Sequence, residues 1–534
     1  MALRHSKQIE MKQSDLNQEV DVVFINPDSS RDAYQNLSSS YSAIEPPTWS
    51  LLLAESIRSK GWNPKIIDAN AERISDEIVV ERIKKYKPRL ICFVVYGQNV
   101  NAGTTNMQGA VRTAKTLKEN SVAAPIALLG SHIQALPKQT LENEGVFDFG
   151  FSNEGVYSLW DVLSLTNIDW NSYKDISGLV VRLPSGQVKI NKVSPIVPSD
   201  RLDFDLPGYA WDLLPYKESP LDLYRSPLWH AEYSEESRTP YAAIQTSLGC
   251  NFGCDFCMIN IINRNDESEI GVASNYSKMR FWSPEFVVRQ IDKLAELGVR
   301  TIRIVDEMFL LYKKHYVPLC EILSRKPYAP DLKMWAYSRV DTVTNPEFLK
   351  LVRSAGIRWL ALGIESARRE IRLEVSKGKF QDVDIRKVVQ HIHEADIEVM
   401  ANFIVGLPGE DYADMQETLD LSIELCTSGW NMYAAMALPG SYLYTKALEK
   451  GYPLPEDYSG YSFHAYNTQP MPTEHLSAAQ VLAFRDSAFT QYHTNPSFLA
   501  RIQRKYGEEA VNNIREMTEV SLKRKLIEEQ AHNN

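Results

Sequence analysis

Residues 246–257 read Thr-Ser-Leu-Gly-Cys-Asn-Phe-Gly-Cys-Asp-Phe-Cys and carry three cysteines in a C-x3-C-x2-C spacing, at Cys250, Cys254 and Cys257. A mononuclear zinc site would need a fourth Cys or His nearby, and the next histidine in the sequence is His315. An iron–sulfur cube held by three cysteines keeps one iron free for a substrate. Gly249 and Gly253 let the backbone wrap around such a cluster. We therefore predict a metal cluster here rather than three unrelated buried thiols.

This stretch resembles the cluster loop of radical S-adenosylmethionine (SAM) enzymes, including the aromatic Phe256 just before the third cysteine. The resemblance implies a 4Fe-4S cluster on the three cysteines, with the amino and carboxylate groups of SAM chelating the fourth iron. It also implies reductive cleavage of SAM to a 5'-deoxyadenosyl radical, with electrons from an external donor of the flavodoxin or ferredoxin type.

The composition is that of an ordinary globular protein with two or three domains. The chain has 534 residues, of which 44% are hydrophobic and 24% are charged. Its net charge of -10 disfavours a nucleic-acid partner. No run approaches the ~20 apolar residues of a membrane span, and residues 1–19 form a polar lead-in without the apolar core of a signal peptide. We therefore expect a cytoplasmic protein. The remaining cysteines, expected to be buried small hydrophobes, are Cys92, Cys320 and Cys426.

An α/β pattern covers residues 20–165. Short apolar runs alternate there with helix-length segments, which predicts a doubly wound parallel sheet of the Rossmann-like or flavodoxin-like type. The expected strands are 21–25, 65–67, 90–95, 126–129 and 147–151. The expected helices are about 49–60, 74–86, 107–119, 135–143 and 154–164. Ligands of such sheets bind at the carboxyl ends of the strands.

The loops of this sheet disfavour a nicotinamide dinucleotide, because no G-x-G-x-x-G follows the first strand. Loop 96–106 is long, polar and not basic, which suits a large uncharged ligand with amide groups, such as a corrin. Placed before the cysteine stretch, the domain resembles the cobalamin-binding domain of cobalamin-dependent radical SAM enzymes. The candidate cobalamin-binding residues are Asn26, Asp68, Tyr96, Gly97, Gln98, Asn99, Thr104, Gly130, Ser131, His132, Asn153, Glu154 and Gly155.

The resemblance is one of layout more than of motif. The D-x-H-x-x-G sequence that supplies a lower cobalt ligand in many cobalamin proteins is absent, and members of this subfamily commonly lack it. His132 is the only histidine in these loops. We expect it to be a structural or corrin-contacting residue rather than a cobalt ligand. A sheet that binds no cofactor is the alternative for the whole domain.

Residues 166–238 are rich in proline and form a predicted connector. Their aromatic side chains either pack between domains or line a substrate site, and packing is favoured. These side chains are Tyr209, Trp211, Tyr216, Tyr224 and Trp229.

A second alternation over residues 239–450 predicts a partial (βα)6 barrel. Its expected strands lie near 241–246, 301–305, 333–337, 359–362, 398–405 and 431–437. Its expected helices include 284–297, 346–354, 384–395 and 412–426. Polar groups follow several of these strands, and the carboxyl ends of barrel strands are where chemistry gathers.

The family resemblance extends to these strand ends. Asp306 and Glu307 occupy the place of the family's G-G-E motif, and the sequence does not decide between them as contacts of SAM. Glu365 matches the residue that reaches the ribose, and Arg339 matches the arginine near the SAM carboxylate. A structural ion pair at the barrel mouth is the alternative for both. The candidate SAM-binding residues are Phe256, Asp306, Glu307, Ser338, Arg339, Glu365, Ser366, Gly406 and Pro408.

Residues 451–534 predict a small helical cap, with helices at 478–492 and 508–529. His464, Arg485 and Asp486 could line a substrate pocket, but surface or packing roles are favoured.

A radical generator and a cobalamin site on one chain favour methyl transfer, from SAM through methylcobalamin to an unactivated carbon, or less often phosphorus, of a small biosynthetic intermediate. An oxidative cyclase or rearrangement enzyme with the same cofactors is the second interpretation, and a cobalamin sensor with a vestigial cluster loop is the third. Methylthiolation is disfavoured, because only Cys92 precedes Cys250. Catalytic side chains beyond the cofactor ligands are not indicated.

Overall fold

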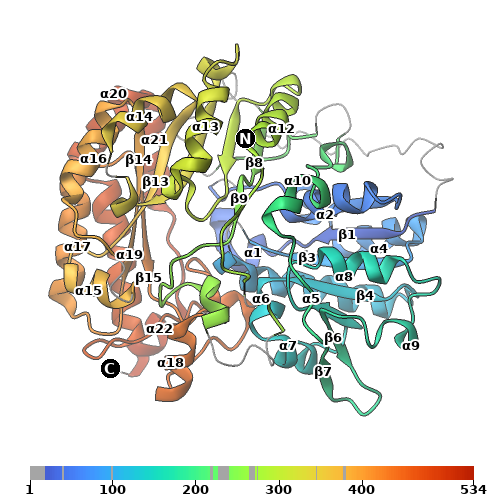
Figure 1. Cartoon of the computed structure of the whole chain (residues 1–534). Helices are drawn as coiled ribbons and strands as arrows, with labels where there is room; N and C mark the ends of the chain where they lie inside the picture. The colour runs from blue at the N-terminus through green and yellow to red at the C-terminus, as the bar shows by residue number, and fades with distance from the viewer. Residues whose placement is uncertain are drawn as a thin grey trace.

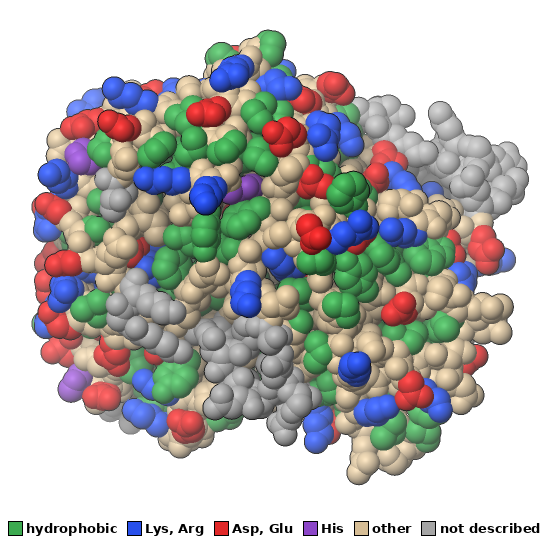
Figure 2. Space-filling model, in the orientation of Figure 1, with side chains coloured by type: hydrophobic (Ala, Val, Ile, Leu, Met, Phe, Trp, Pro, Cys, Tyr) green, Lys and Arg blue, Asp and Glu red, His purple; other side chains and the backbone are tan. Residues whose placement is uncertain are grey.

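The computed structural model describes residues 19–38, 41–97, 100–216, 220–226, 240–263, 271–273, 275–343, 345–376 and 380–533. Two large β-sheets lie side by side. The N-terminal sheet is on the right of Figure 1 in blue to teal, and the second sheet is on the left in yellow to orange. On the face in Figure 2, basic and acidic side chains are mixed and form no continuous basic stripe. No described helix is long and apolar enough to cross a membrane.

The N-terminal sheet has seven strands in the order β2-β1-β3-β4-β5-β6-β7. Neighbouring strands from β2 to β5 are parallel, as predicted, while β6 and β7 are antiparallel. The order 2-1-3-4-5 is that of flavodoxin-like folds, whose ligand-binding switch point lies between β1 and β3. The strands are β1 (Val22–Asn26), β2 (Pro64–Asp68), β3 (Leu90–Val95), β4 (Ile126–Gly130), β5 (Phe149–Phe151), β6 (Leu179–Arg182) and β7 (Val188–Ile190).

Helices cover both faces of this sheet because its strands are apolar on both sides. Val22 and Phe24 pack with α2 (Thr48–Arg58) and α8 (Val156–Leu163), whereas the alternate residues Val23 and Ile25 pack with α4 (Asp76–Tyr86) and α5 (Gly103–Glu119). The other helices are α1 (Ser30–Tyr34), α3 (Ala69–Glu72), α4 (Asp76–Tyr86), α5 (Gly103–Glu119), α6 (Ser131–Ala135), α7 (Pro137–Asn143), α9 (Trp170–Tyr173) and α10 (Leu202–Asp205). The doubly wound prediction is confirmed.

The predicted connector departs from its expected role, because β6 and β7 extend the N-terminal sheet past residue 165. Its aromatic residues pack as the favoured interpretation expects. Tyr209 and Trp211 stack at 4.9 Å, and both belong to the main apolar core, as does Tyr224. Tyr216 is partly buried, and Trp229 lies outside the described residues.

The second sheet has six parallel strands in the order β15-β14-β13-β12-β11-β8, which confirms the partial barrel. The strands are β8 (Tyr241–Ile244), β11 (Thr301–Ile304), β12 (Lys333–Arg339), β13 (Ile357–Glu365), β14 (Glu398–Val405) and β15 (Gly429–Ala434). Helices along it are α12 (Pro284–Glu296), α13 (Lys313–Leu323), α14 (Pro346–Ser354), α15 (Arg369–Val375), α16 (Ile385–Glu394) and α17 (Tyr412–Leu425). The barrel is open between β8 and β15.

The C-terminal region covers the β15 edge of this opening. Trp430 of β15 stacks on Tyr492 of α19 at 5.0 Å, and Figure 1 shows α19 beside β15. The predicted single helix 508–529 is wrong, because the chain is not helical between Glu519 and Lys525, and α20 was not predicted. The helices are α18 (Tyr442–Lys450), α19 (Ala478–His493), α20 (Pro496–Tyr506), α21 (Glu508–Glu519) and α22 (Lys525–Asn533).

The N-terminal domain closes the β8 side of the opening. Glu45, from the segment before α2, forms an ion pair of 2.8 Å with Arg303 of β11. The other oxygen of its carboxylate accepts a hydrogen bond of 2.8 Å from the hydroxyl of Tyr241 in β8. Both ionic side chains are largely buried. The two sheets are therefore joined by a buried polar contact beside the barrel interior.

Candidate functional site

The cysteine loop begins at the carboxyl end of β8 and is held there by Asp306. One carboxylate oxygen of Asp306 accepts from the amide of Thr246 at 2.6 Å, and the other accepts from the hydroxyls of Thr246 and Ser247 at 2.5 and 2.7 Å. Gly249 has a φ of 86°, and a Cβ there would lie 2.7 Å from the carbonyl oxygen of Lys278. Only glycine accommodates this turn into the cysteines.

All three cysteines line one cavity of about 790 Å³, which is called the large cavity below. Burial raises the pKa of Cys250 to about 12 and that of Cys254 to about 11, so both are neutral thiols without a metal. A bound cation reverses this preference, because its charge stabilises thiolates. Three thiols that line one cavity are a donor set that fits an iron–sulfur cluster.

Asn101 connects this loop to the N-terminal sheet. Its amide nitrogen lies 3.6 Å from the sulfur of Cys257, and its amide oxygen accepts a hydrogen bond of 2.9 Å from the backbone of Met258. Asn101 follows β3, so the N-terminal sheet and the cysteine loop contact each other directly. Asn101 belongs to the predicted ligand loop 96–106, but its contact with the cysteine loop was not predicted.

The large cavity gathers five of the candidate SAM-binding residues, and four lie outside its lining. The five that line it are Phe256, Glu307, Ser338, Arg339 and Glu365. The four that do not are Asp306, Ser366, Gly406 and Pro408.

Each of these four has a structural reason for its place. Both carboxylate oxygens of Asp306 accept hydrogen bonds from Thr246 and Ser247 at the start of the cysteine loop. The hydroxyl of Ser366 lies 3.3 Å from the side chains of Glu410 and Thr418. A Cβ on Gly406 would meet Val481 of α19 at 2.3 Å, and the carbonyl of Pro408 accepts from Glu474. Of Asp306 and Glu307, between which the sequence did not decide, Glu307 is thus the one whose side chain faces the cavity.

Glu365 ends β13 in a strained backbone conformation. Its φ of 67° is in the left-handed region, where the pairing of β13 with β14 shifts register. Such strain in a residue other than glycine is typical of functional sites. A Cβ on Gly363 would lie 2.6 Å from its carboxylate, so a larger residue there would displace this carboxylate. Burial raises the pKa of Glu365 to about 7, although Arg339 opposes the shift.

Arg339 forms its ion pair with Asp341 rather than with Glu365. Both hydrogen bonds of this pair are 2.6 Å long, and the guanidinium lies 3.7 Å from the ring centre of Phe252 in the cysteine loop. Among the described residues, Glu365 has no ion-pair partner. The alternative of a structural pair therefore holds for Arg339 with Asp341 and not for Glu365.

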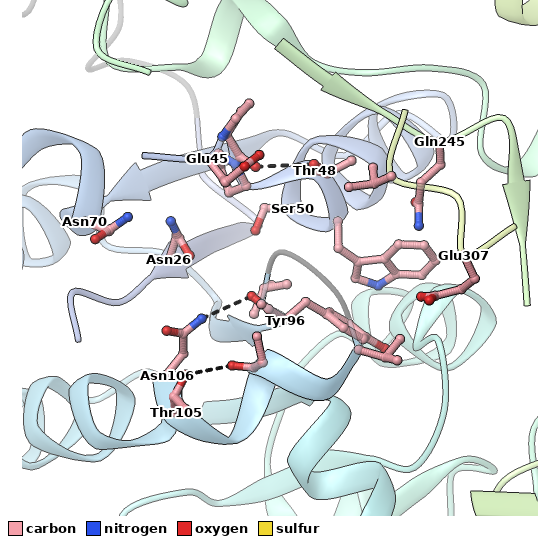
Figure 3. A pocket seen from close by; sticks show the side chains of 18 of the residues that line it. Asn26, Glu45, Thr48, Ser50, Asn70, Tyr96, Thr105, Asn106, Gln245 and Glu307 are labelled. Atoms are coloured by element: carbon pink, nitrogen blue, oxygen red, sulfur yellow. Dashed lines mark hydrogen bonds between the residues drawn. The ribbon is translucent and has the colours of Figure 1, made fainter. Parts of the chain in front are cut away.

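A second, smaller cavity of about 180 Å³ lies at the carboxyl ends of β1 and β3, where the switch point was expected. Figure 3 shows its polar wall, with amide side chains and hydroxyls from several helices, strand ends and loops. Predicted residues that line it are Asn26, Tyr96, Gly97 and Glu154. Asn70 and Asn106, which also line it, belong to the predicted loops at strand ends, where ligand contacts were expected. Residues that the sequence did not single out are Trp49, Ser50 and Gln245.

The other candidate cobalamin residues support this wall or lie elsewhere. Asp68 is buried, accepts from Asn26 and Tyr224 at 2.7 Å, and so orients Asn26. Burial raises its pKa to about 6. Those that do not line the small cavity are Asp68, Thr104, Gly130, Ser131, His132, Asn153 and Gly155. Gln98 and Asn99 lie outside the described residues.

His132 sits in the packed interior. Its Nδ1 lies 3.1 Å from the hydroxyl of Thr104, and its ring packs edge-on against Tyr458 at 5.1 Å. Burial lowers its pKa to about 4, so the imidazole is neutral. This environment agrees with the expectation of a structural histidine. Glu154 is likewise engaged, because it forms a buried ion pair with Arg280.

The small cavity fits part of a corrin by its donor set. The hydroxyl of Ser50 and the amide oxygen of Gln245 are buried there and have no hydrogen-bond partner among the described residues. Unpaired buried polar atoms are costly, so a ligand with amide groups would satisfy them. The cavity adjoins the large one, and the residues that line both include Tyr34, Ala102, Thr105, Ile259 and Glu307. A corrin, which exceeds the small cavity, would extend into the large one.

The large cavity continues from the cysteines through the barrel interior towards α19. Residues of β12, β14 and β15 line it, for example Tyr337, Asn402 and Tyr433, and those of β14 do so at every second position. Alternation of side chains along a strand could have predicted which strand residues face the cavity, but the sequence analysis did not use it. His464, Arg485 and Asp486 also line the cavity, contrary to the favoured surface or packing roles.

Two family models match the chain: the B12 binding domain over residues 37–159 and the Radical SAM superfamily over residues 244–422. The uncharacterized methyltransferase PH0819 of Pyrococcus horikoshii is 24% identical over 463 residues, 85% of this chain and 89% of that protein. The anaerobic magnesium-protoporphyrin IX monomethyl ester cyclase of Cereibacter sphaeroides is 24% identical over 427 residues, 77% of this chain and 61% of that protein.

The fold is also found in solved structures. The radical SAM methyltransferase TsrM from Kitasatospora setae, with cobalamin and a 4Fe-4S cluster bound, superimposes with a TM-score of 0.63 at 16% identity, covering 94% of this chain and all of that one. The cobalamin-dependent SAM radical enzyme OxsB, with aqua-cobalamin and SAM bound, gives a TM-score of 0.63 at 14% identity, covering 91% of this chain and 70% of that one.

Proposed function

The chain belongs to the cobalamin-dependent radical SAM enzymes, and we propose that it transfers a methyl group from SAM, by way of methylcobalamin, to an unactivated carbon, or less often phosphorus, of a small biosynthetic intermediate. The observation that carries this proposal is the large cavity, which is lined by the cluster cysteines, by loops of the cobalamin domain and by the C-terminal region. A substrate in it would face both cofactors at once.

When bound, the cofactors supply a 5'-deoxyadenosyl radical for hydrogen abstraction and a methyl group for transfer. The side chains of this chain hold and orient them. Cys250, Cys254 and Cys257 bind the cluster, while Glu307 and Glu365 offer carboxylates to the hydrogen-bond donors of SAM. Asn26, Asn106 and the backbone around Gly97 offer hydrogen bonds to the amide rim of the corrin.

Relatives named as methyltransferases support methyl transfer, including the hopanoid C-2 methylase of Rhodopseudomonas palustris. Relatives named as magnesium-protoporphyrin IX monomethyl ester cyclases favour a second candidate, an oxidative cyclase with the same cofactors. Both candidates need an external one-electron donor of the flavodoxin or ferredoxin type. They differ in whether the methyl carbon of SAM enters the product.

SAM with a deuterated methyl group separates the two candidates. For a methyltransferase, each turnover should consume two SAM molecules, one giving S-adenosylhomocysteine and one giving 5'-deoxyadenosine, and the product should carry all three deuteriums. Reduced enzyme without substrate should already form S-adenosylhomocysteine by methylating its cobalamin. A product that carries no deuterium, formed with 5'-deoxyadenosine alone, would reject methyl transfer in favour of the cyclase.

A further inference from the structure

The end of the large cavity beside α19 has its own chemistry. It is called the inner pocket here and is defined by six of the residues that line the cavity: Tyr433, Phe463, His464, Arg485, Asp486 and Phe489. None of these residues belongs to the candidate cluster, SAM or cobalamin sites. The inner pocket is therefore the part of the cavity that is left for the substrate.

Arg485 lies in this pocket with one edge of its guanidinium unused. The side chain is only 9% exposed, although arginine is almost never buried unless paired. Its Nε donates to the carbonyl of Met432 at 3.0 Å, and its Nη1 donates to Asp486 at 3.1 Å. Its Nη2 has no partner among the described residues. Since Arg485 lines the cavity, this edge is available to a ligand.

The buried charges around Arg485 do not balance. Asp486 is shared with a second buried guanidinium, Arg524, which donates to both of its oxygens at 2.8 and 2.9 Å. Two guanidinium groups thus face one carboxylate. His464 and His493, which also line the cavity, add no charge at neutral pH, because burial lowers their pKa to about 3 and about 4. Glu519 stands at the cavity rim, where it is exposed to solvent.

A comparison with Arg303 shows what is missing at Arg485. Arg303 is only 1% exposed, but no second guanidinium among the described residues shares its partner Glu45, and the net effect of its surroundings raises its pKa. The pKa of Arg485 is lowered instead, by burial first and by Arg524, although Asp486 opposes the shift. A buried cation with too little countercharge is stabilised by an added anion, and a guanidinium edge suits the paired oxygens of a carboxylate or phosphate.

Aromatic rings line the inner pocket beside Arg485. Arg485 lies 5.7 Å from the ring centre of Phe489, and Tyr433 packs against Phe463 at 4.9 Å. Along the sheet, Met432 pairs with Phe403, which pairs with Glu365. β13 and β15 are thus two strand spacings apart, about 10 Å. A molecule of modest length could reach from Arg485 towards the SAM side of the cavity.

We propose that the substrate carries a carboxylate or phosphate group, which Arg485 binds through its unused guanidinium edge, and an adjacent apolar body that packs against the rings of the inner pocket. This inference rests on the proposed function, since it concerns the substrate of that same cavity. Arg485 is then the residue that selects anionic substrates.

The test measures binding, not turnover, on the full chain loaded with cluster and cobalamin. Isothermal titration calorimetry would compare 3-phenylpropionate and phenyl phosphate with the neutral 3-phenylpropanamide. The wild type should bind at least one of the two anions more tightly than the amide. The affinity for the preferred anion should fall roughly tenfold to 100-fold in Arg485→Gln. Arg485→Lys should restore part of the loss, and the exposed control Arg386→Gln should leave it unchanged.

Asp486→Asn controls for a folding artefact, because we expect it to change anion affinity in the opposite direction. Removal of the competing carboxylate should tighten anion binding, while melting curves report whether each variant is folded. Equal affinity for 3-phenylpropionate, phenyl phosphate and 3-phenylpropanamide in the wild type would overturn the proposal, as would unchanged anion affinity in folded Arg485→Gln. Because the readout needs no product, a protein that binds anions but transfers no methyl group would keep this inference and reject the proposed function.

Discussion

Glu45→Gln should loosen the junction between the two sheets. The carboxylate of Glu45 pairs with Arg303 at 2.8 Å, where the two side chains are 11% and 1% exposed. Loss of one partner of a buried pair costs 3–5 kcal/mol, because the other charge stays buried without compensation. Glutamine keeps an acceptor for Tyr241, so we expect the lower limit, about 3 kcal/mol. At about 2 °C per kcal/mol, the melting temperature should fall by about 6 °C.

Two further variants make this test specific. Glu45→Gln combined with Arg303→Met removes both charges, and it should be more stable than Glu45→Gln alone, because it leaves no uncompensated buried charge. Glu424→Gln disrupts the exposed pair with Arg386 and should leave the melting temperature within error. Calorimetry of all variants at equal cofactor loading provides the measurement. A Glu45→Gln protein as stable as Glu424→Gln would refute the reasoning.

Cys254→Ala should abolish the cluster, which would be seen as loss of about four irons per chain and of the spectral change on adding SAM. Cys92→Ala, in the core of β3, should keep the irons and the spectral change. Equal loss in the two variants would reject the assignment. Electron paramagnetic resonance of the Co(II) enzyme should show no nitrogen splitting from a protein ligand, and His132→Ala should leave the spectrum unchanged, because His132 is packed against Thr104 and Tyr458. Burial raises the pKa of Glu410 to about 7, above its unfolded value, so this group stabilises the fold at low pH and its contribution is lost as the pH rises from about 4.5 to about 7. Glu410→Gln should therefore flatten the pH dependence of the unfolding free energy by about 3 kcal/mol over that range, and an unchanged slope would contradict the assignment.

The fold was predictable where burial leaves a continuous apolar run in the sequence. β3 occupies the predicted range 90–95, because each of its residues is buried in a parallel sheet. The break between α21 and α22 was not predictable in this way. Arg524 at the break is fixed by Asp486 and by the carbonyl oxygens of Phe463 and Ala465, which come from distant parts of the chain. Local helix propensity continues through the break, and tertiary contacts override it.

The candidate site also has a part that was predictable from the sequence and a part that was not. The cysteines and the carboxylates after strands were predictable, because their spacing and their place at strand ends carry the signal. Trp49, Ser50 and Gln245 were missed, since they come from the start of a helix and from the residue before the cysteine loop. Asn495 followed by Pro496 was a readable start of α20, with an asparagine cap and proline in the first turn.

Arg485 shows the limit of sequence interpretation most clearly, because an arginine on a helix is expected to be exposed. It is buried only because α19 docks against β15 at the open edge of the barrel. The matches to the two family models end at residue 422, so β15, α19 and all six residues of the inner pocket lie outside them. The cofactor loops thus lie largely in the matched ranges, while the wall that would contact the substrate comes from the remainder. Chains that share both models can therefore differ in substrate, and sequence comparison beyond residue 422, at Arg485 and Asp486 above all, is where such differences should be sought.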